Sequence, residues 1–275
     1  MTTVAQKFGK FAAGLDAGAV PAGVRHAAKR CLVDWWGGML AGSVEAPATV
    51  LVEALAPGTG PARLLPSGRG TDARTAALIN GTAAHTVEVD DIYSPALYHP
   101  GVAVIVAVMA GGVDPTEVER VEVGTYRAGV EICGNTDPAT PYEAKFSLPY
   151  TVALAALKRP VDLAAFAPER LHDPELRAMM ARIRVALAPE AEGAFPALRA
   201  AEVAITTRDG QVRWFRQPTR RGDPDFPVSD ADLGAKFRML AVPVIGMAAA
   251  EVTAAALWRV DELTSVAAVP TGAGA

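Results

Sequence analysis

The densest group of ionisable side chains in this 275-residue chain lies between residues 80 and 101. From residue 80 the chain reads N-G-T-A-A-H-T-V-E-V-D-D, and Y-H-P-G follows from residue 98. Two imidazoles and three carboxylates within so short a span can take up and deliver protons, as general acid–base catalysis requires. The sequence therefore predicts a polar pocket in an otherwise apolar, helical protein.

His99 is the first candidate for such chemistry. Pro100 suits the first turn of a helix, which places His99 near the N-cap of the apolar helix predicted to follow. Free backbone N–H groups and the helix dipole attract anions to such a position. We therefore predict that His99 transfers a proton to or from an anionic substrate. The alternative is a histidine that only caps the helix.

Helices are predicted to position these residues. Val4, Phe8, Phe11 and Leu15 recur at spacings of three and four, which indicates one buried helical face. A second helix is predicted to begin at Pro21, with a buried side that carries Val24, Ala28, Cys31, Leu32, Trp35 and Met39. A third helix is expected over residues 47–55, a short extended piece over 62–65, and a helix capped by Asp72 after that.

The pattern changes after Gly112. Residues 121–125 alternate as a strand does, and residues 201–207 and 211–215 flank an Asp-Gly turn, which predicts a β-hairpin. Helices are expected over 148–157 and from Asp173-Pro174. Ser229 is expected to cap a long helix from Asp230 to about residue 260, kinked or broken at Pro243.

This order of elements predicts a mostly α protein. A helical part over residues 1–112 precedes an α+β domain over 113–228, and further helices cover 229–265. The net charge of −4 argues against nucleic acid as a partner, because phosphate binding needs a basic face. Four arginines, at 213, 216, 220 and 221, are interpreted as part of a solvated loop.

Cysteine spacing and hydropathy predict a cytoplasmic protein without metal or membrane partners. Cys31 and Cys133 show no C-x-x-C spacing and are expected to be small buried groups. The charge-free apolar run from Gly101 to Val113 is too short to span a bilayer. The first ten residues lack the apolar core of a secretory signal.

Several motifs, in the right order, resemble the MmgE/PrpD family, that of 2-methylcitrate dehydratase. L-V-D-W-W-G-G-M-L-A-G-S from residue 32 is similar to the family's L-x-D-x-x-G-x-x-x-A-G-S helix. The stretch from residue 76 to 91 and the pair His99-Pro100 are similar to its A-A-x-x-N-G, N-G-x-x-x-H-x-x-D-x-D-D and H-P motifs. E-A-K-F-S-L-P-Y from residue 143 and a K-F pair at residue 236 complete the resemblance.

This resemblance implies an all-helical domain with a smaller α+β lid, the C-terminal helix returning to the helical domain. The family's T-K-x-x-H-x-G segment, which helps to hold substrate carboxylates, has no counterpart here. The chain passes from Gly112 almost directly to the strand at Val121, so an internal deletion is expected. The missing segment predicts a substrate that is less charged than methylcitrate.

The resemblance also implies roles for individual residues. His99, Glu88 and Lys145 are implied to be catalytic, with Glu88 at the first Asp of D-x-D-D and Lys145 directed from the lid toward the substrate. Substrate-binding roles are implied for Asp90, Asp91, His85 and Tyr150. The alternatives are solvated turns for the acids, a hydrogen-bonded core group for His85, a surface position for Lys145 and a half-buried aromatic for Tyr150.

The expected function is that of a lyase of the dehydratase type, or an isomerase, acting next to a carboxylate of a small organic acid. The resemblance implies neither a metal nor a cofactor. A decarboxylase of the same family is an alternative. Another is a non-catalytic remnant that serves as a binding or regulatory subunit. The remnant would expose an apolar face where helices are missing, covered by a second copy in a homodimer or by a partner subunit.

Overall fold

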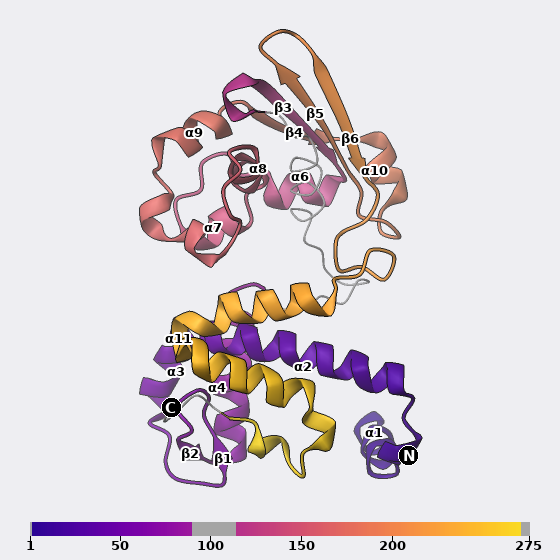
Figure 1. The fold of residues 1–275 in the computed structure, drawn as a ribbon, viewed down its shortest axis with the longest axis vertical. Coiled ribbons are helices and arrows are strands. Elements are labelled where there is room, and N and C mark those ends of the chain that lie inside the picture. The colour runs from indigo at the N-terminus through magenta and orange to yellow at the C-terminus, as the bar shows by residue number, and fades with distance from the viewer. Residues whose placement is uncertain (1, 90–113, 271–275) are drawn as a thin grey trace. The chain divides into compact units, whose positions relative to one another are not determined.

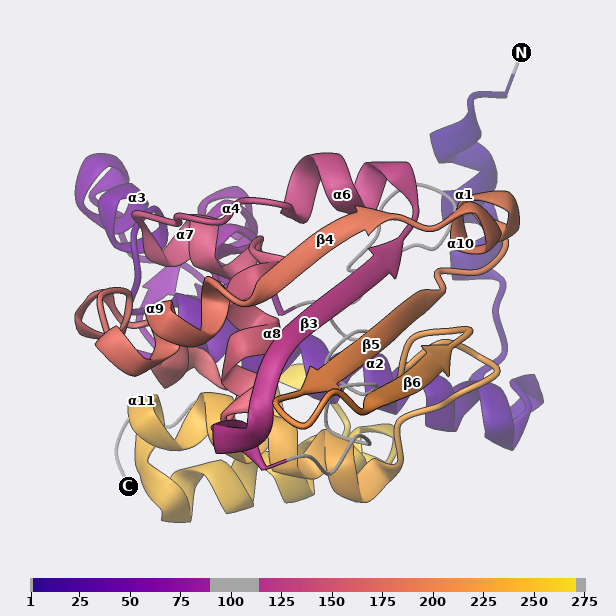
Figure 2. The ribbon, with the colours of Figure 1, turned by 90° about the horizontal axis from the view of Figure 1, so that it is seen from above.

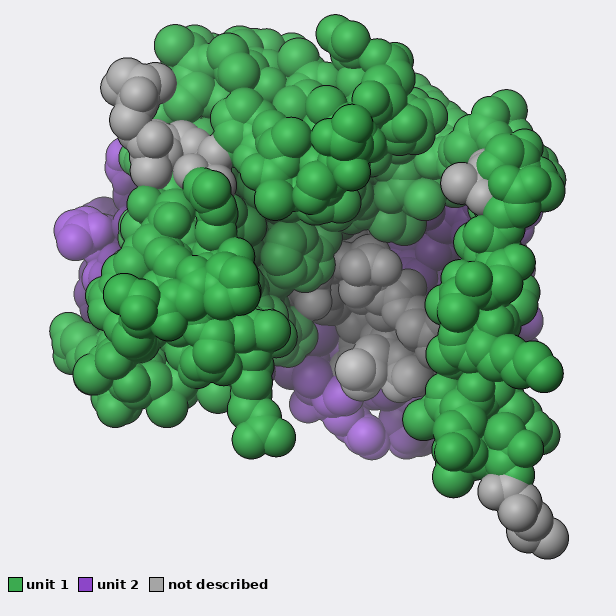
Figure 3. Space-filling model, turned by 90° about the horizontal axis from the view of Figure 1, so that it is seen from below, with its two compact units in different colours: residues 1–91, 230–275 green, residues 92–229 purple. Residues whose placement is uncertain are grey.

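A computed structural model describes residues 2–89 and 114–270 of the chain. The protein is mostly α-helical with a small mixed sheet, as predicted. Its contacts divide it into two compact units (Figure 1). Unit 1 combines residues 1–91 with residues 230–275, and unit 2 comprises residues 92–229 (Figure 3). The C-terminal helix thus belongs to the same unit as the N-terminal helices.

Helix α2 (Ala22–Gly42) is the centre of unit 1 and packs against α4 (Ala73–Thr86) and α11 (Asp230–Trp258) (Figure 1). Glycine makes this packing possible. A Cβ at Gly42 would lie 1.9 Å from the carbonyl oxygen of Ala83, so the backbones of α2 and α4 are in direct contact there. On another side of α2, a Cβ at Gly37 would lie 3.3 Å from Leu240 of α11.

The predicted buried side of α2 is wrong in part. Met39 is buried, but Val24 and Cys31 are exposed. The buried residues lie in the second half of the helix, at Val33, Trp36, Gly37, Gly38, Met39, Leu40, Ala41 and Gly42. Burial follows the two neighbouring helices, which contact α2 on its glycine-containing sides, and apolar periodicity alone does not identify glycine positions as contacts.

Helix α1 (Val4–Ala13) forms as predicted, but its apolar stripe is not buried. Thr3 caps the helix, accepting a hydrogen bond from the Gln6 amide at 3.2 Å. Val4, Phe8, Phe11 and Leu15 are all more than half exposed, Phe8 at 70%. The expectation of a buried face is therefore wrong within the part of the chain that the structure describes.

The predicted start of α4 is confirmed. The Asp72 carboxylate accepts hydrogen bonds from the Arg74 and Thr75 amides, both at 3.0 Å. Helix α3 (Ala48–Leu55) packs on α4, and β1 (Ala62–Arg63) pairs with β2 (Gly70–Thr71) in an antiparallel ladder. Asn80 on α4 holds this region, because its amide accepts from the Leu65 N–H and donates to the Arg63 carbonyl.

Helix α11 begins at Asp230, directly after Ser229, and is interrupted near the predicted position. The break falls at Gly246, which has φ 77° and ψ 163°, three residues beyond Pro243. Pro243 lacks an N–H for the helix, and glycine adopts a positive φ without steric cost. By length and composition alone, α11 would be apolar enough to cross a membrane. Leu240 and Leu257, on either side of the break, are both buried.

Unit 2 contains a four-stranded sheet in the order β4-β3-β5-β6 (Figure 2). Strand β3 (Val118–Thr125) pairs in parallel with β4 (Ile183–Leu187) and antiparallel with β5 (Ala201–Thr207). Strand β6 (Val212–Gln217) pairs antiparallel with β5. The predicted Asp-Gly hairpin is confirmed, with Gly210 at φ 84° in the turn.

Helices of unit 2 cover one face of this sheet (Figure 2). They are α6 (Arg127–Cys133), α7 (Pro141–Lys145), α8 (Leu148–Ala156) and α9 (Pro174–Met180). Helix α10 (Pro189–Ala194) packs separately, with Ala191 in a small cluster with Ala188 and Ala200. Every residue of α8 is buried, and it packs in one core with Val121, Val203 and Ile205 of the sheet. Short 3-10 turns lie at Ala17–Ala19, Pro115–Glu117, Leu163–Phe166, Pro168–Arg170, Val260–Glu262 and Val266–Ala268.

The arginine-rich stretch that ends unit 2 departs from the prediction of a solvated loop. Arg220 is buried, and its guanidinium donates to the Asp223 carboxylate at 2.7 Å. Asp223 also accepts from the Thr219 hydroxyl at 2.8 Å. This carboxylate neutralises a buried cation, which a count of charges along the sequence does not reveal.

We predict that Gly42→Ala strongly destabilises the protein. The added methyl group would overlap the Ala83 carbonyl, so α2 and α4 must separate, at a cost of about 2–4 kcal/mol. Chemical denaturation measures this loss. Gly81→Ala is the matched control, because a Cβ at this helical position in α4 meets no atom within 4 Å. It is expected to stabilise by about 0.5–1 kcal/mol. Equal behaviour of the two variants would contradict the packing argument.

Candidate functional site

Residues 88–91 of the sequence, which contain Glu88, Asp90 and Asp91, are called the acid segment. The segment follows the C-terminal end of α4. His85 lies in the last turn of this helix with its side chain 71% exposed, whereas the Glu88 side chain is only 17% exposed. The His85 Nε2 and Glu88 Oε1 atoms are 4.0 Å apart. The interpretation of His85 as a core group is wrong, because its side chain is exposed while its neighbours Ala83 and Ala84 are buried. The two side chains form an imidazole–carboxylate pair.

Glu88 has an unusual backbone conformation. Its φ is 57°, in the left-handed region that non-glycine residues occupy at a cost of about 1–2 kcal/mol. Its amide donates to the His85 carbonyl at 3.2 Å, which closes the end of the helix. Such conformations persist where surrounding contacts impose them, and they concentrate at functional sites. Ala56 and Lys158 have the same left-handed conformation after α3 and α8, so at Glu88 it marks the end of α4.

One contact at the end of this stretch comes from α11. The Lys236 ammonium donates to the Asp34 carboxylate of α2 at 2.6 Å and to the Val89 carbonyl at 2.5 Å. Sequence reasoning assigned no role to Lys236 or Asp34. Both lie in motifs that carry the family resemblance, but a separation of 202 residues gave no indication that they meet. The remaining members of the acid segment, Asp90 and Asp91, lie outside the described residues, and so does His99.

Lys145 is in unit 2, where it ends α7 and is half-buried. Capping contacts fix the chain on both sides of it. The Thr140 hydroxyl accepts from the Glu143 amide at 3.2 Å, and the Glu143 carboxylate accepts from the Ala139 amide at 2.7 Å. After the lysine, the Ser147 hydroxyl accepts from the Tyr150 amide at 3.1 Å. The E-A-K-F-S-L-P-Y motif is therefore two consecutive capped helices with Lys145 at their junction.

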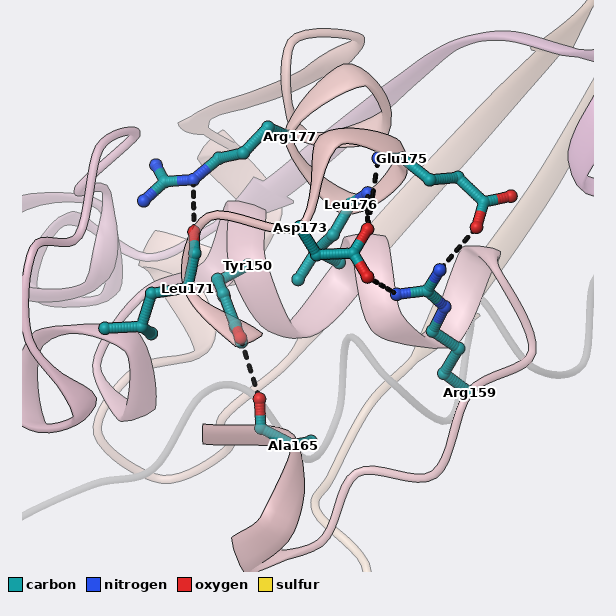
Figure 4. Close-up of polar contacts among 8 residues, drawn as sticks. All are labelled: Tyr150, Arg159, Ala165, Leu171, Asp173, Glu175, Leu176 and Arg177. Carbon is teal, nitrogen blue, oxygen red and sulfur yellow. Dashed lines mark hydrogen bonds and ion pairs between the residues drawn. The ribbon is translucent and has the colours of Figure 1, made fainter. Parts of the chain in front are cut away.

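Arg177 of α9 holds the loop that leads to α7. Its guanidinium donates to the Asp137 carboxylate and to the Pro138 carbonyl, both at 2.7 Å, and to the Leu171 carbonyl at 2.6 Å. Figure 4 shows the bond to Leu171. These bonds connect α9 to the chain just before the lysine-bearing helix, and so the position of Lys145 depends on α9.

Asp173 in turn fixes the start of α9 (Figure 4). Its carboxylate accepts from the Glu175 and Leu176 amides at 3.0 Å and pairs with Arg159 at 2.9 Å. The hydrogen bond from the Leu176 amide, followed by that from Arg159, holds the pKa of Asp173 below its usual value. Arg159 also donates to the Glu175 carboxylate. A charged network of Arg159, Asp173 and Glu175 therefore stabilises the start of α9, where the negative carboxylate of Asp173 is favoured by the helix dipole.

Tyr150 is fully buried in the core of unit 2. Its hydroxyl donates to the Ala165 carbonyl at 2.7 Å (Figure 4), and its ring packs against Phe166. Burial raises the pKa of Tyr150 above its usual value. This geometry is that of a structural aromatic with a satisfied hydroxyl. It favours the structural alternative for Tyr150, although burial is deeper than the half-buried position considered from sequence.

The structure thus brings His85 and Glu88 together in unit 1, and it places Lys145 and Tyr150 in unit 2. Over residues 2–89 and 114–270, it contains no group of three or more His, Cys, Asp or Glu side chains placed to hold a metal ion. Unit 1 therefore contains a largely buried carboxylate with an imidazole 4.0 Å away, and both are group types that general acid–base catalysis uses.

Comparisons with known proteins identify the family. The MmgE/PrpD N-terminal domain matches residues 6–155, and the MmgE/PrpD C-terminal domain matches residues 96–262. The chain belongs to the MmgE/PrpD family. It is also similar to cis-aconitate decarboxylase of Mus musculus, with 27% identity over 101 residues. This match covers 37% of the chain and 20% of the mouse protein, so the chain spans about a fifth of that relative.

We predict that Tyr150→Phe lowers stability without changing substrate affinity. Phenylalanine fills the same space, but the Ala165 carbonyl loses its hydrogen bond, at a cost of about 1 kcal/mol. Chemical denaturation measures this change. Tyr142→Phe is the control, since Tyr142 of α7 is 61% exposed. If Tyr150→Phe instead raises KM for a turned-over substrate at unchanged stability, Tyr150 binds substrate as the resemblance implied.

Proposed function

We propose that this member of the MmgE/PrpD family is a lyase that acts next to a carboxylate of a small organic acid. Family membership supports a dehydratase or decarboxylase type of reaction. The observation that carries the proposal is Glu88, a largely buried carboxylate held in a left-handed backbone conformation at the end of α4. Its segment leads directly to the Asp90–Asp91 pair in the sequence.

In the proposed reaction, His99 and Glu88 move protons. In a dehydration, a base takes the proton from the carbon next to the carboxylate, and an acid protonates the departing hydroxyl group, which leaves as water. Lys145 would contact a substrate carboxylate, because an ammonium group offsets the charge that develops there. None of these steps uses a metal or a cofactor.

A decarboxylation is the closest alternative reaction. The similarity to cis-aconitate decarboxylase supports it, although the match covers only part of either chain. In that reaction the bond to the carboxyl carbon breaks, carbon dioxide leaves, and an acid delivers a proton to the remaining carbon. The same groups would serve, so the product distinguishes the two reactions. Without a T-K-x-x-H-x-G segment, we propose a substrate less charged than methylcitrate.

We expect His99→Ala to lower kcat by about 10²–10⁴-fold, because a positioned acid or base is lost. Small di- and tricarboxylic acids, cis-aconitate among them, are the substrates to screen, with absorbance of the alkene and release of carbon dioxide as readouts. Glu88→Gln should lower kcat in the same way while it preserves the shape of the side chain. His172→Ala is the control, since this histidine is exposed in unit 2. Unchanged turnover in His99→Ala would overturn the proposal.

A second candidate function is that of a binding subunit, and α1 favours it. Its stripe of Val4, Phe8, Phe11 and Leu15 has the spacing of a seam between two helices packed side by side. We propose that α1 of a second copy of this chain covers the stripe, since like helices bury both stripes at once.

Under this proposal, the double variant Phe8→Ser/Phe11→Ser shifts the protein from dimer to monomer. Replacing both exposed rings removes most of the apolar area of the stripe. Sedimentation over a range of protein concentrations measures the shift, and the melting temperature of the wild type should rise with concentration. Trp214→Ser is the control, because Trp214 is an exposed aromatic on β6 of unit 2. A wild-type protein that is monomeric at all concentrations would exclude this pairing.

A further inference from the structure

We infer that Lys236 is a positioning residue that holds the acid segment in the geometry its chemistry requires. This inference rests on the proposed lyase function. Lys236 belongs to α11, and its ammonium group donates to two acceptors on different parts of unit 1. One is the Asp34 carboxylate on α2, and the other is the Val89 carbonyl just after α4. A single cation therefore joins three elements at the place where the acid segment begins.

The two bonds have different roles. Asp34 fixes the ammonium group, because a partly buried ion pair is screened less by water than an exposed one. The Val89 carbonyl is then held by a donor that cannot move away. An uncharged acceptor paired with an ammonium group makes a stronger bond than a neutral pair does. Asp34 anchors the lysine, and the lysine anchors the backbone.

The bond from Lys236 to the Val89 carbonyl is important because of where this carbonyl lies in the chain. It belongs to the peptide bond between Val89 and Asp90, and it is the last described peptide group before the predicted Asp90–Asp91 pair. Immediately before it, Glu88 occupies its left-handed conformation. A left-handed residue reverts to a commoner conformation unless its neighbours prevent this. Lys236 therefore sets the direction in which the chain leaves α4, and with it the orientation of the Glu88 carboxylate.

This role is separable from that of joining α2 to α11. Gly37 of α2 already packs against Phe237 and Leu240 of α11, and both of these side chains are buried. Losing one ammonium group leaves that apolar contact intact. Removal of the lysine head should therefore loosen the acid segment much more than the helices around it.

Hydrogen exchange of backbone amides, measured by mass spectrometry on the full chain, tests this inference. Lys236→Met retains the aliphatic stem and removes both donated bonds. We expect exchange at residues 85–89 to become about tenfold faster or more, as the loss of a charge-assisted bond predicts, with α2 and α11 changed less than about twofold. Arg238→Met is the matched control: Arg238 lies on the same helix, and its ion pair with Glu251 does not involve the acid segment.

Two further measurements distinguish positioning from a general structural role. Lys236→Arg retains a cationic donor and should keep exchange at residues 85–89 within about threefold of the wild type. For any acid that the wild type turns over, Lys236→Met should lower kcat about tenfold and change KM less than about twofold, because a misplaced carboxylate affects the transition state more than binding.

Unchanged exchange at residues 85–89 in Lys236→Met would overturn the inference. Exchange that rises equally throughout unit 1 would do the same, because it would indicate a purely structural lysine. If Lys236→Met fails to fold, Lys236→Gln, which retains an N–H donor, is measured against the same two criteria. The exchange result does not depend on turnover. If the wild type turns over an acid but Lys236→Met leaves exchange at residues 85–89 unchanged, the positioning role alone is rejected. If Lys236→Met speeds exchange only at residues 85–89 but the wild type turns over no acid, the lyase function alone is rejected.

Discussion

Direct backbone contact between α2 and α4 is the constraint on which the rest of unit 1 depends. It exists because residue 42 is glycine, where any Cβ would overlap the Ala83 carbonyl. The contact fixes the last turns of α4, which carry His85 and lead to Glu88. On another side of α2, Gly37 brings α11 close enough for Lys236 to reach Asp34 and Val89. Close packing and charge thus act on the same short segment.

In unit 2, hydrogen bonds fix the part of the chain that carries Lys145. Lys145 lies at the junction of two capped helices, and Arg177 fixes the loop before them. Asp173 fixes the helix that carries Arg177. Lys145 has a proposed role toward substrate, and Glu143, Ser147 and Tyr150 of the same motif make hydrogen bonds within unit 2. The motif therefore specifies a conformation more than a set of reactive groups.

Local signals in the sequence predicted local structure well. The Asp72 cap, the Asp-Gly hairpin and the helix at Asp173-Pro174 were confirmed because each depends on a few neighbouring residues. Predictions that depended on neighbours distant in sequence were less successful. The stripe of α1 is exposed, part of the expected face of α2 is exposed, and Arg220 is buried against Asp223. Periodicity shows that a helix has an apolar side, but not which element covers that side.

The same distinction applies to the candidate site. By itself, the sequence determined the family, the mostly helical class, and the segment in which acids and imidazoles gather, since these follow from residue types in order. Only the tertiary structure decided that His85 is exposed and that Glu88 has a left-handed backbone conformation and a largely buried side chain. It also decided that the Lys236 ammonium group reaches the Val89 carbonyl. The reason is physical: burial and hydrogen bonding are set by groups that meet across the fold, and the chain separates Lys236 from Asp34 by 202 residues.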